Sequence, residues 1–113
     1  MDEARASELL ATERARIERQ LRELGPLPDD ELAHADQHLA EEATELYEDE
    51  YEAGLIERLR NELEAVERAE ARLADGTYGL SIESGAPIPD ERLELVPTAE
   101  RTAEEQDRYE RGR

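Results

Sequence analysis

Residues 56–74 read IERLRNELEAVERAEARLA, and this stretch decides the fold. Its large apolar residues recur with a period of seven, as Leu59, Val66 and Leu73 with Ile56 and Leu63 interleaved. Such spacing is typical of the apolar seam of a coiled-coil helix. Upstream, Leu32, Leu39 and Leu46 again repeat by seven. We therefore predict one long helix over residues 30–74.

A partner for this helix precedes it in the chain. Leu10, Ile17 and Leu24 are spaced by seven, with Leu21 four residues after Ile17, which predicts a helix over about residues 2–24. Gly25 to Pro28 end it, because glycine suits the position after a helix and proline cannot continue one. The short connection favours antiparallel pairing of the two helices. A homodimer through the same seam is the alternative.

The composition agrees with a thin helical seam and favours a basic partner. Charged residues make up 41% of the 113 residues and aromatic residues 4%, too few for a thick globular core. The 32 acidic residues face 14 arginines and no lysine, for a net charge of -18. This charge argues against binding to duplex DNA or an anionic membrane surface and favours a basic partner protein. Solubility alone is the other explanation of the acidity.

The absence of cysteine excludes disulfides, thiolate metal sites and a cysteine nucleophile. The sequence shows no apolar run of membrane-spanning length and no signal-like N-terminus, so we expect a cytoplasmic location.

The helical period breaks at residues 75–79, DGTYG, where Gly76 is the expected C-terminal cap. Residues 80–97 alternate prolines and glycine with apolar residues, which predicts a compact, loop-rich knob with room for two very short strands. Residues 98–113 are charged and suit a short helix. The predicted fold is all-α dominated, with a long antiparallel coiled-coil hairpin at residues 1–75 and a knob with a C-terminal helix at residues 76–113.

Residues 71–79, ARLADGTYG, followed by IPDERLELVPTA at residues 88–99, resemble the C-terminal half of the DksA/TraR family. The resemblance extends over roughly residues 30–106. These bacterial regulators insert a coiled-coil hairpin into the secondary channel of RNA polymerase and carry a four-cysteine zinc finger. The resemblance implies the same partner and a finger-like knob here.

The departure from the family pattern lies at the four cysteine positions, which are occupied by Ser81, Ser84, Thr102 and Glu105. Hydroxyls do not replace thiolates as structural zinc ligands, and one carboxylate cannot hold the ion alone. We therefore expect neither zinc nor any cofactor. An apolar cluster would hold the knob, together with hydrogen bonds from the three hydroxyl residues; its expected members are Tyr78, Leu80, Ile82, Ile88, Leu93, Leu95 and Val96. Partial disorder of the knob is the alternative.

The resemblance also implies that the hairpin tip contacts the partner. Family members present an acidic residue followed two positions later by alanine, and ungapped counting places this pair at Glu41 and Ala43. Asp36, in HADQH at residues 34–38, is a second candidate. Such a carboxylate would act near the polymerase active centre by charge and hydrogen bonding. The plain alternative is that Glu41 is one more solvated acid.

No cluster of residues indicates an enzyme. Carboxylate pairs arise by chance at this acid density, and the sequence contains neither a nucleophile elbow nor a phosphate-binding loop. His34 and His38 share a helix face but alone make a weak metal site. The resemblance to the DksA/TraR family therefore implies a transcription regulator, expected to be monomeric, that binds RNA polymerase and no specific DNA sequence. A non-enzymatic coiled-coil adaptor, or a dimeric structural protein, is the alternative from another class.

Overall fold

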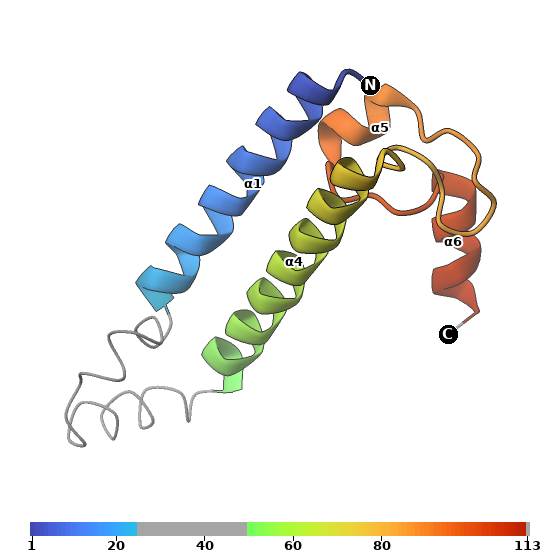
Figure 1. The fold of residues 1–113 in the computed structure, drawn as a ribbon. Coiled ribbons are helices and arrows are strands. Elements are labelled where there is room, and N and C mark those ends of the chain that lie inside the picture. The colour runs from blue at the N-terminus through green and yellow to red at the C-terminus, as the bar shows by residue number, and fades with distance from the viewer. Residues whose placement is uncertain (25–49, 113) are drawn as a thin grey trace. The chain divides into compact units, whose positions relative to one another are not determined.

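The computed structural model describes residues 1–24 and 50–112 of the chain. Its helices are α1 (Glu3–Leu24), α4 (Glu50–Asp75), α5 (Asp90–Leu95) and α6 (Ala103–Arg111), shown in Figure 1. The only strand-like pairing in these ranges is an isolated antiparallel bridge between Leu80 and Pro87. The predicted all-α character is therefore confirmed. None of the helices in the described part of the chain has the length and apolar run that a bilayer crossing requires.

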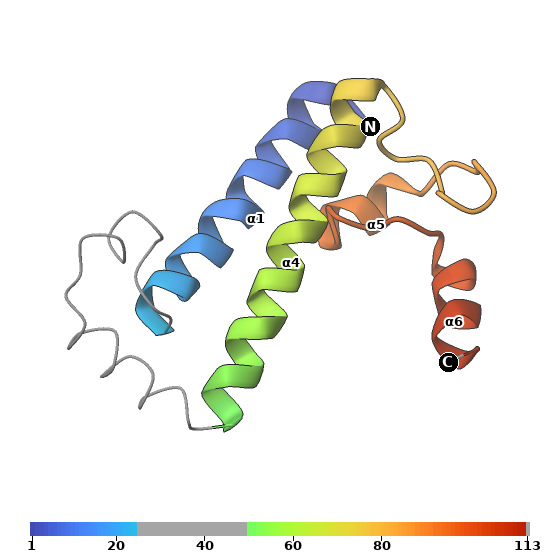
Figure 2. The ribbon, with the colours of Figure 1, turned by 60° about the horizontal axis from the view of Figure 1, so that its bottom comes forward.

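The contacts divide the chain into two compact units, and the first contains Met1–Glu13 and Ala65–Arg113. In this unit the start of α1 and the end of α4 run side by side in opposite directions (Figure 2). Their seam is made of Ala6 and Leu10 from α1 with Val66 and Ala69 from α4, all at most 1% exposed. Two of these four buried side chains, Ala6 and Ala69, are small.

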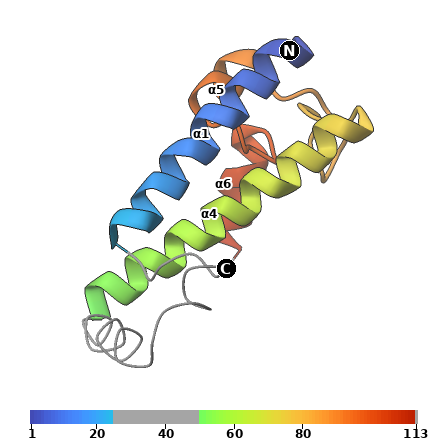
Figure 3. The same cartoon turned by 60° about the vertical axis from the view of Figure 1, so that its left-hand side comes forward.

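The second unit, Arg14–Glu64, holds the other half of the helix pair. Ile17 of α1 is fully buried, and Ile56 and Leu59 of α4 have only a few per cent of their surface exposed. An ion pair between Arg16 Nη2 and Glu62 Oε1, 3.0 Å apart, joins the two helices beside this seam. Figure 3 shows the same antiparallel course from another side. Each unit by itself therefore confirms the predicted intramolecular helix pairing.

The structure ends α1 at Leu24 and α4 at Asp75, within one residue of the predicted ends, but α5 (Asp90–Leu95) forms in a stretch that the sequence predicted to be loop with very short strands. Gly76, with φ at +81°, ends α4. The amide of Thr77 donates to the carbonyl of Arg72 at 2.9 Å, and the amide of Gly76 donates to the carbonyl of Leu73 at 3.2 Å. These two bonds form a Schellman cap, which satisfies carbonyls that the helix leaves free. The part of the predicted long helix at residues 30–49 lies outside the described residues.

The knob packs around a smaller core than the sequence predicts. Ile88, Leu93 and Ala99 form this core, and Tyr78 packs against it and donates its hydroxyl to the Pro97 carbonyl at 2.8 Å. The expected core membership is wrong for four residues, whose exposed fractions are 40% for Leu80, 51% for Ile82, 85% for Leu95 and 41% for Val96.

Local geometry explains these exposed side chains. Ser81 points into the knob, so its neighbours Leu80 and Ile82 point outward, as alternate residues of extended chain do. Leu93 fills the core from the six-residue helix α5, and Leu95, two residues later, lies on the opposite face.

Two carboxylates attach the knob to the helices of the first unit. Glu100 Oε2 accepts hydrogen bonds from Arg68 Nε at 3.1 Å and from Arg72 Nη1 at 2.9 Å, and these arginines lie one turn apart on α4. On the other side, Arg5 of α1 binds Glu94 of α5 through two bonds of 2.8 and 2.6 Å. Bidentate arginine–carboxylate geometry fixes orientation as well as distance. The knob is therefore held against both helices.

Candidate functional site

The candidate site residues fall into two groups. The tip candidates Asp36, Glu41 and Ala43 lie outside the described residues, and so do His34 and His38. The four residues at the expected cysteine positions come together in the knob, although up to 24 residues separate them in sequence (105 minus 81). We call this group the polar cluster; it comprises Ser81, Ser84, Thr102 and Glu105.

The first half of the polar cluster is a tight loop organised by Ser81. The Ser81 side chain is almost fully buried, and its Oγ accepts hydrogen bonds from the amides of Glu83 at 3.0 Å and Ser84 at 3.2 Å. Its backbone carbonyl accepts from the amide of Gly85 at 2.9 Å. Gly85 has φ of +76°, a conformation that glycine adopts without steric cost. The loop thus directs the Ser81 hydroxyl inward.

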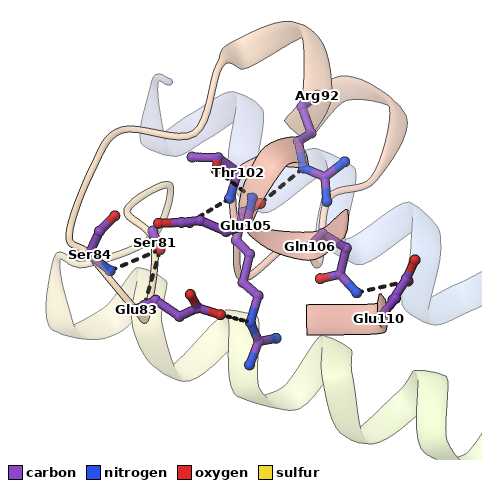
Figure 4. A network of polar contacts seen from close by, with 9 residues as sticks. Ser81, Glu83, Ser84, Arg92, Thr102, Glu105, Gln106 and Glu110 are labelled. Carbon is purple, nitrogen blue, oxygen red and sulfur yellow. Dashed lines mark hydrogen bonds and ion pairs between the residues drawn. The ribbon is translucent and has the colours of Figure 1, made fainter. Parts of the chain in front are cut away.

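The second half is the N-terminus of α6. Thr102 Oγ1 accepts a hydrogen bond from the Glu105 amide at 3.2 Å, and Glu105 Oε1 accepts one from the Thr102 amide at 2.9 Å. This reciprocal pair is a capping box, which satisfies two amides that the first helical turn leaves free. Figure 4 shows the Glu105 side chain lying between Thr102 and Ser81.

Glu105 joins the two halves. Its side chain is 6% exposed. Hydrogen bonds from the Ser81 and Ser84 hydroxyls, with those from Thr102, lower the pKa of Glu105 to about 2 and outweigh the opposing effect of burial. The carboxylate also lies in the first turn of α6, where the helix dipole favours negative charge. Glu105 is therefore ionised at neutral pH, and hydrogen-bond donors from both halves surround it.

Beside the polar cluster lies a second polar connection that sequence reasoning missed. Arg101 Nε donates to Glu83 Oε2 at 2.5 Å, and its guanidinium lies over the Tyr109 ring, 3.8 Å from the ring centre. The Arg101 carbonyl accepts from Arg92 Nε at 3.0 Å, a bond also drawn in Figure 4. Glu83 and Arg101 are 18 residues apart with no motif around them, so nothing in the sequence marks this pair.

This arrangement suits a structural role better than a catalytic one. A carboxylate that stays ionised and accepts several hydrogen bonds is a poor proton donor near neutral pH. The Ser81 hydroxyl is buried beneath its own loop and donates to Glu105, whose pKa of about 2 makes that carboxylate too weak a base to activate a serine nucleophile. The polar cluster therefore cross-links the loop at residues 81–86 to the start of α6.

Comparison with known proteins adds the family. A family model described as "Prokaryotic dksA/traR C4-type zinc finger" matches residues 76–111. The solved structure of transcription factor DksA2 from Pseudomonas aeruginosa matches with a TM-score of 0.62 and 32% identity, over 96% of this chain and 83% of that one. The chain belongs to the DksA/TraR family.

Curated relatives agree with this assignment to the DksA/TraR family. The chain is 38% identical over 78 residues to the RNA polymerase-binding transcription factor DksA of Caulobacter vibrioides, covering 69% of this chain and 54% of that protein. It is 36% identical over 97 residues to general stress protein 16O of Bacillus subtilis, covering 86% and 57%. To YteA of the same organism it is 43% identical over 74 residues, covering 66% and 31%. The chain thus spans about a third to somewhat over half of the length of these relatives.

The family description names a zinc finger with four cysteines, and the residues of this chain do not fit that ion. Two serines, one threonine and one glutamate supply no thiolate or imidazole, the usual ligands of structural zinc. Moreover, the hydroxyls and the carboxylate already bind one another and the backbone. In this family member, hydrogen bonds and one buried charge connect the loop at residues 81–86 to the start of α6.

Proposed function

We propose that this DksA/TraR family member is a transcription regulator that binds bacterial RNA polymerase through the secondary channel. The observation that carries the proposal is the likeness to DksA2, at 32% identity over 96% of this chain. A second relative, from Caulobacter vibrioides, is named as an RNA polymerase-binding transcription factor. The net charge of -18 supports a basic partner surface, because complementary charge speeds and orients association.

The proposed contact with the active centre is made by the hairpin tip. Residues 25–49 connect α1 to α4, and they include Asp36, Glu41 and Ala43. A carboxylate there would act on the polymerase by charge and hydrogen bonding, so this chain would contribute no catalytic group of its own. In this proposal the hairpin at residues 1–75 enters the channel, and the knob at residues 76–113 stays outside it.

Further features of the proposal follow from this mode of action. The protein works as a monomer, because the seam between α1 and α4 is filled within each unit by residues such as Ile17 and Val66. It reaches promoters through the polymerase rather than by reading DNA sequence, which agrees with its acidity. Its place of action is the cytoplasm, where the polymerase is.

Charge-neutral variants at the tip test the proposal. The double variant Asp36→Asn with Glu41→Gln should abolish the effect on initiation in transcription with the polymerase of the source organism, while binding persists. The matched control is Glu57→Gln with Glu64→Gln, because both acids are exposed on α4 and form no ion pair with any described residue.

Each result has a distinct meaning. An unchanged transcriptional effect in the tip variant would show that these acids are not the functional ones. An equal loss in the control would show that total negative charge, rather than the tip, carries the effect. Loss of binding in the tip variant alone would mean that these carboxylates anchor the complex instead of acting on the active centre.

A further inference from the structure

The knob carries an exposed apolar groove, and the leucine in it does not contribute to the core of the knob. Pro87, Pro89, Leu95 and Ala103 line it, all of them exposed, and it encloses about 430 Å³. Leu95 is 85% exposed, the highest value among the large apolar side chains that the structure describes. Single exposed leucines are common on protein surfaces, whereas a leucine beside two prolines in a groove is a contiguous apolar surface.

Leu95 does not contribute to the core of the knob. The core is made by Ile88, Leu93 and Ala99, and Leu93 already represents α5 in it. Because Leu95 lies on the opposite face of α5, replacing it by a polar residue removes no core contact. Its apolar side chain is therefore available to a partner.

The rim of the groove carries two carboxylates that have no partner among the described residues. Glu91, in the first turn of α5, and Glu104, in the first turn of α6, border the groove, and neither side chain has an ion-pair or hydrogen-bond partner within residues 1–24 and 50–112. The single cation in the lining, Arg92, already uses its Nε on the Arg101 carbonyl. Free carboxylates beside an apolar surface complement a cationic segment that also carries a large apolar side chain.

We propose that this groove is a docking site for a basic protein segment. An aliphatic side chain of the segment packs on Leu95 and the two prolines, and a flanking arginine or lysine binds Glu91 and Glu104. The site goes beyond the proposed action of the hairpin tip, because its residues all belong to the knob.

The test uses the full-length, isotope-labelled chain and a defined probe. The probe is a short synthetic peptide in which arginines flank a pair of leucines, and the matched control peptide has serines in place of the leucines. Amide signals are followed by NMR during titration. The leucine peptide should shift the signals of α5 and of the start of α6, whereas the serine peptide should produce only diffuse shifts over the acidic helices.

Variants make the test specific. Leu95→Ser should weaken binding of the leucine peptide and raise its dissociation constant at least about tenfold, equivalent to about 1.4 kcal/mol. Glu91→Gln with Glu104→Gln should weaken it as well, because it removes the charges that bind the arginines. Leu80→Ser is the matched control, since Leu80 is 40% exposed but lies outside the groove lining.

The proposal is overturned if Leu95→Ser binds the leucine peptide as tightly as the unchanged protein does. It is also overturned if neither peptide binds, or if both peptides shift the same signals. These results say nothing about polymerase, so a failure here leaves the proposed function standing and can be told apart from its failure.

Discussion

Replacing Ser81 by alanine is expected to loosen the knob while leaving the helix pair intact. Ser81 Oγ accepts hydrogen bonds from two backbone amides, at 3.0 and 3.2 Å, and its hydroxyl also donates to Glu105. Each bond to a neutral amide contributes about 1 kcal/mol net, so losing two of them in a buried loop costs about 2 kcal/mol. The lost donation to Glu105 acts in the same direction. An opening equilibrium should therefore rise about 30-fold.

Hydrogen exchange at individual amides measures this opening locally. The informative amides are those of Ile82, bound to the Glu100 carbonyl, and Ile88, bound to the Gly79 carbonyl. Their exchange should accelerate in Ser81→Ala, while that of Ile17 in α1 should not. Ser7→Ala is the matched control, because Ser7 is exposed on α1. An acceleration below about threefold, which is about 0.7 kcal/mol, would refute the role given to Ser81.

Other predictions concern charge, backbone and metal. Because hydrogen bonds hold the pKa of Glu105 at about 2 instead of 4.5, its stabilising effect is complete above about pH 4.5 and is lost as the pH falls through 2. The difference in thermal midpoint between the unchanged protein and Glu105→Gln should accordingly shrink over that window, and a difference independent of pH would contradict this. Gly54→Ala should stabilise the protein in urea unfolding by about 1 kcal/mol, since Gly54 lies inside α4 with open space around it. Gly79→Ala should destabilise the protein, because Gly79 has φ of +86°. If Gly79→Ala stabilised the protein and Gly54→Ala destabilised it, the backbone conformations described for these two glycines would be refuted. Replacing all four residues of the polar cluster by cysteine should create a zinc site, since four thiolates are a sufficient ligand set. Metal analysis of that variant beside the unchanged protein checks this, and a variant without bound zinc would argue against a shared site.

The helix pair was predictable from sequence because the large apolar residues that become buried recur at regular spacing along both helices. Ile17 and Val66, placed in the seam by their heptad spacing, are both fully buried. Ala6 and Ala69 are equally buried, but the pattern did not identify them, because alanine is common on both faces of helices. The signal thus comes from large side chains, while the buried alanines of the seam carry none.

The interior of the knob was less predictable, because its elements are too short to show a period. α5 has six residues, so Leu93 and Leu95 look equivalent in sequence although one is buried and the other is 85% exposed. Two local signals went unused in the sequence analysis: Pro89 followed by two acids at the start of α5, and threonine three residues before Glu105 for the capping box. The assignment of the hairpin tip stays a prediction, since its residues lie outside the described ranges.

The proposed entry into the secondary channel requires direct binding to RNA polymerase. The purified protein is titrated against RNA polymerase from its own source, with and without a known secondary-channel factor as competitor. If the protein binds in the secondary channel, its binding is saturable and the competitor displaces it. Saturable binding that the competitor leaves unchanged would place the contact elsewhere on the polymerase. No binding at micromolar concentration would contradict the proposed function and favour a coiled-coil adaptor with the same fold.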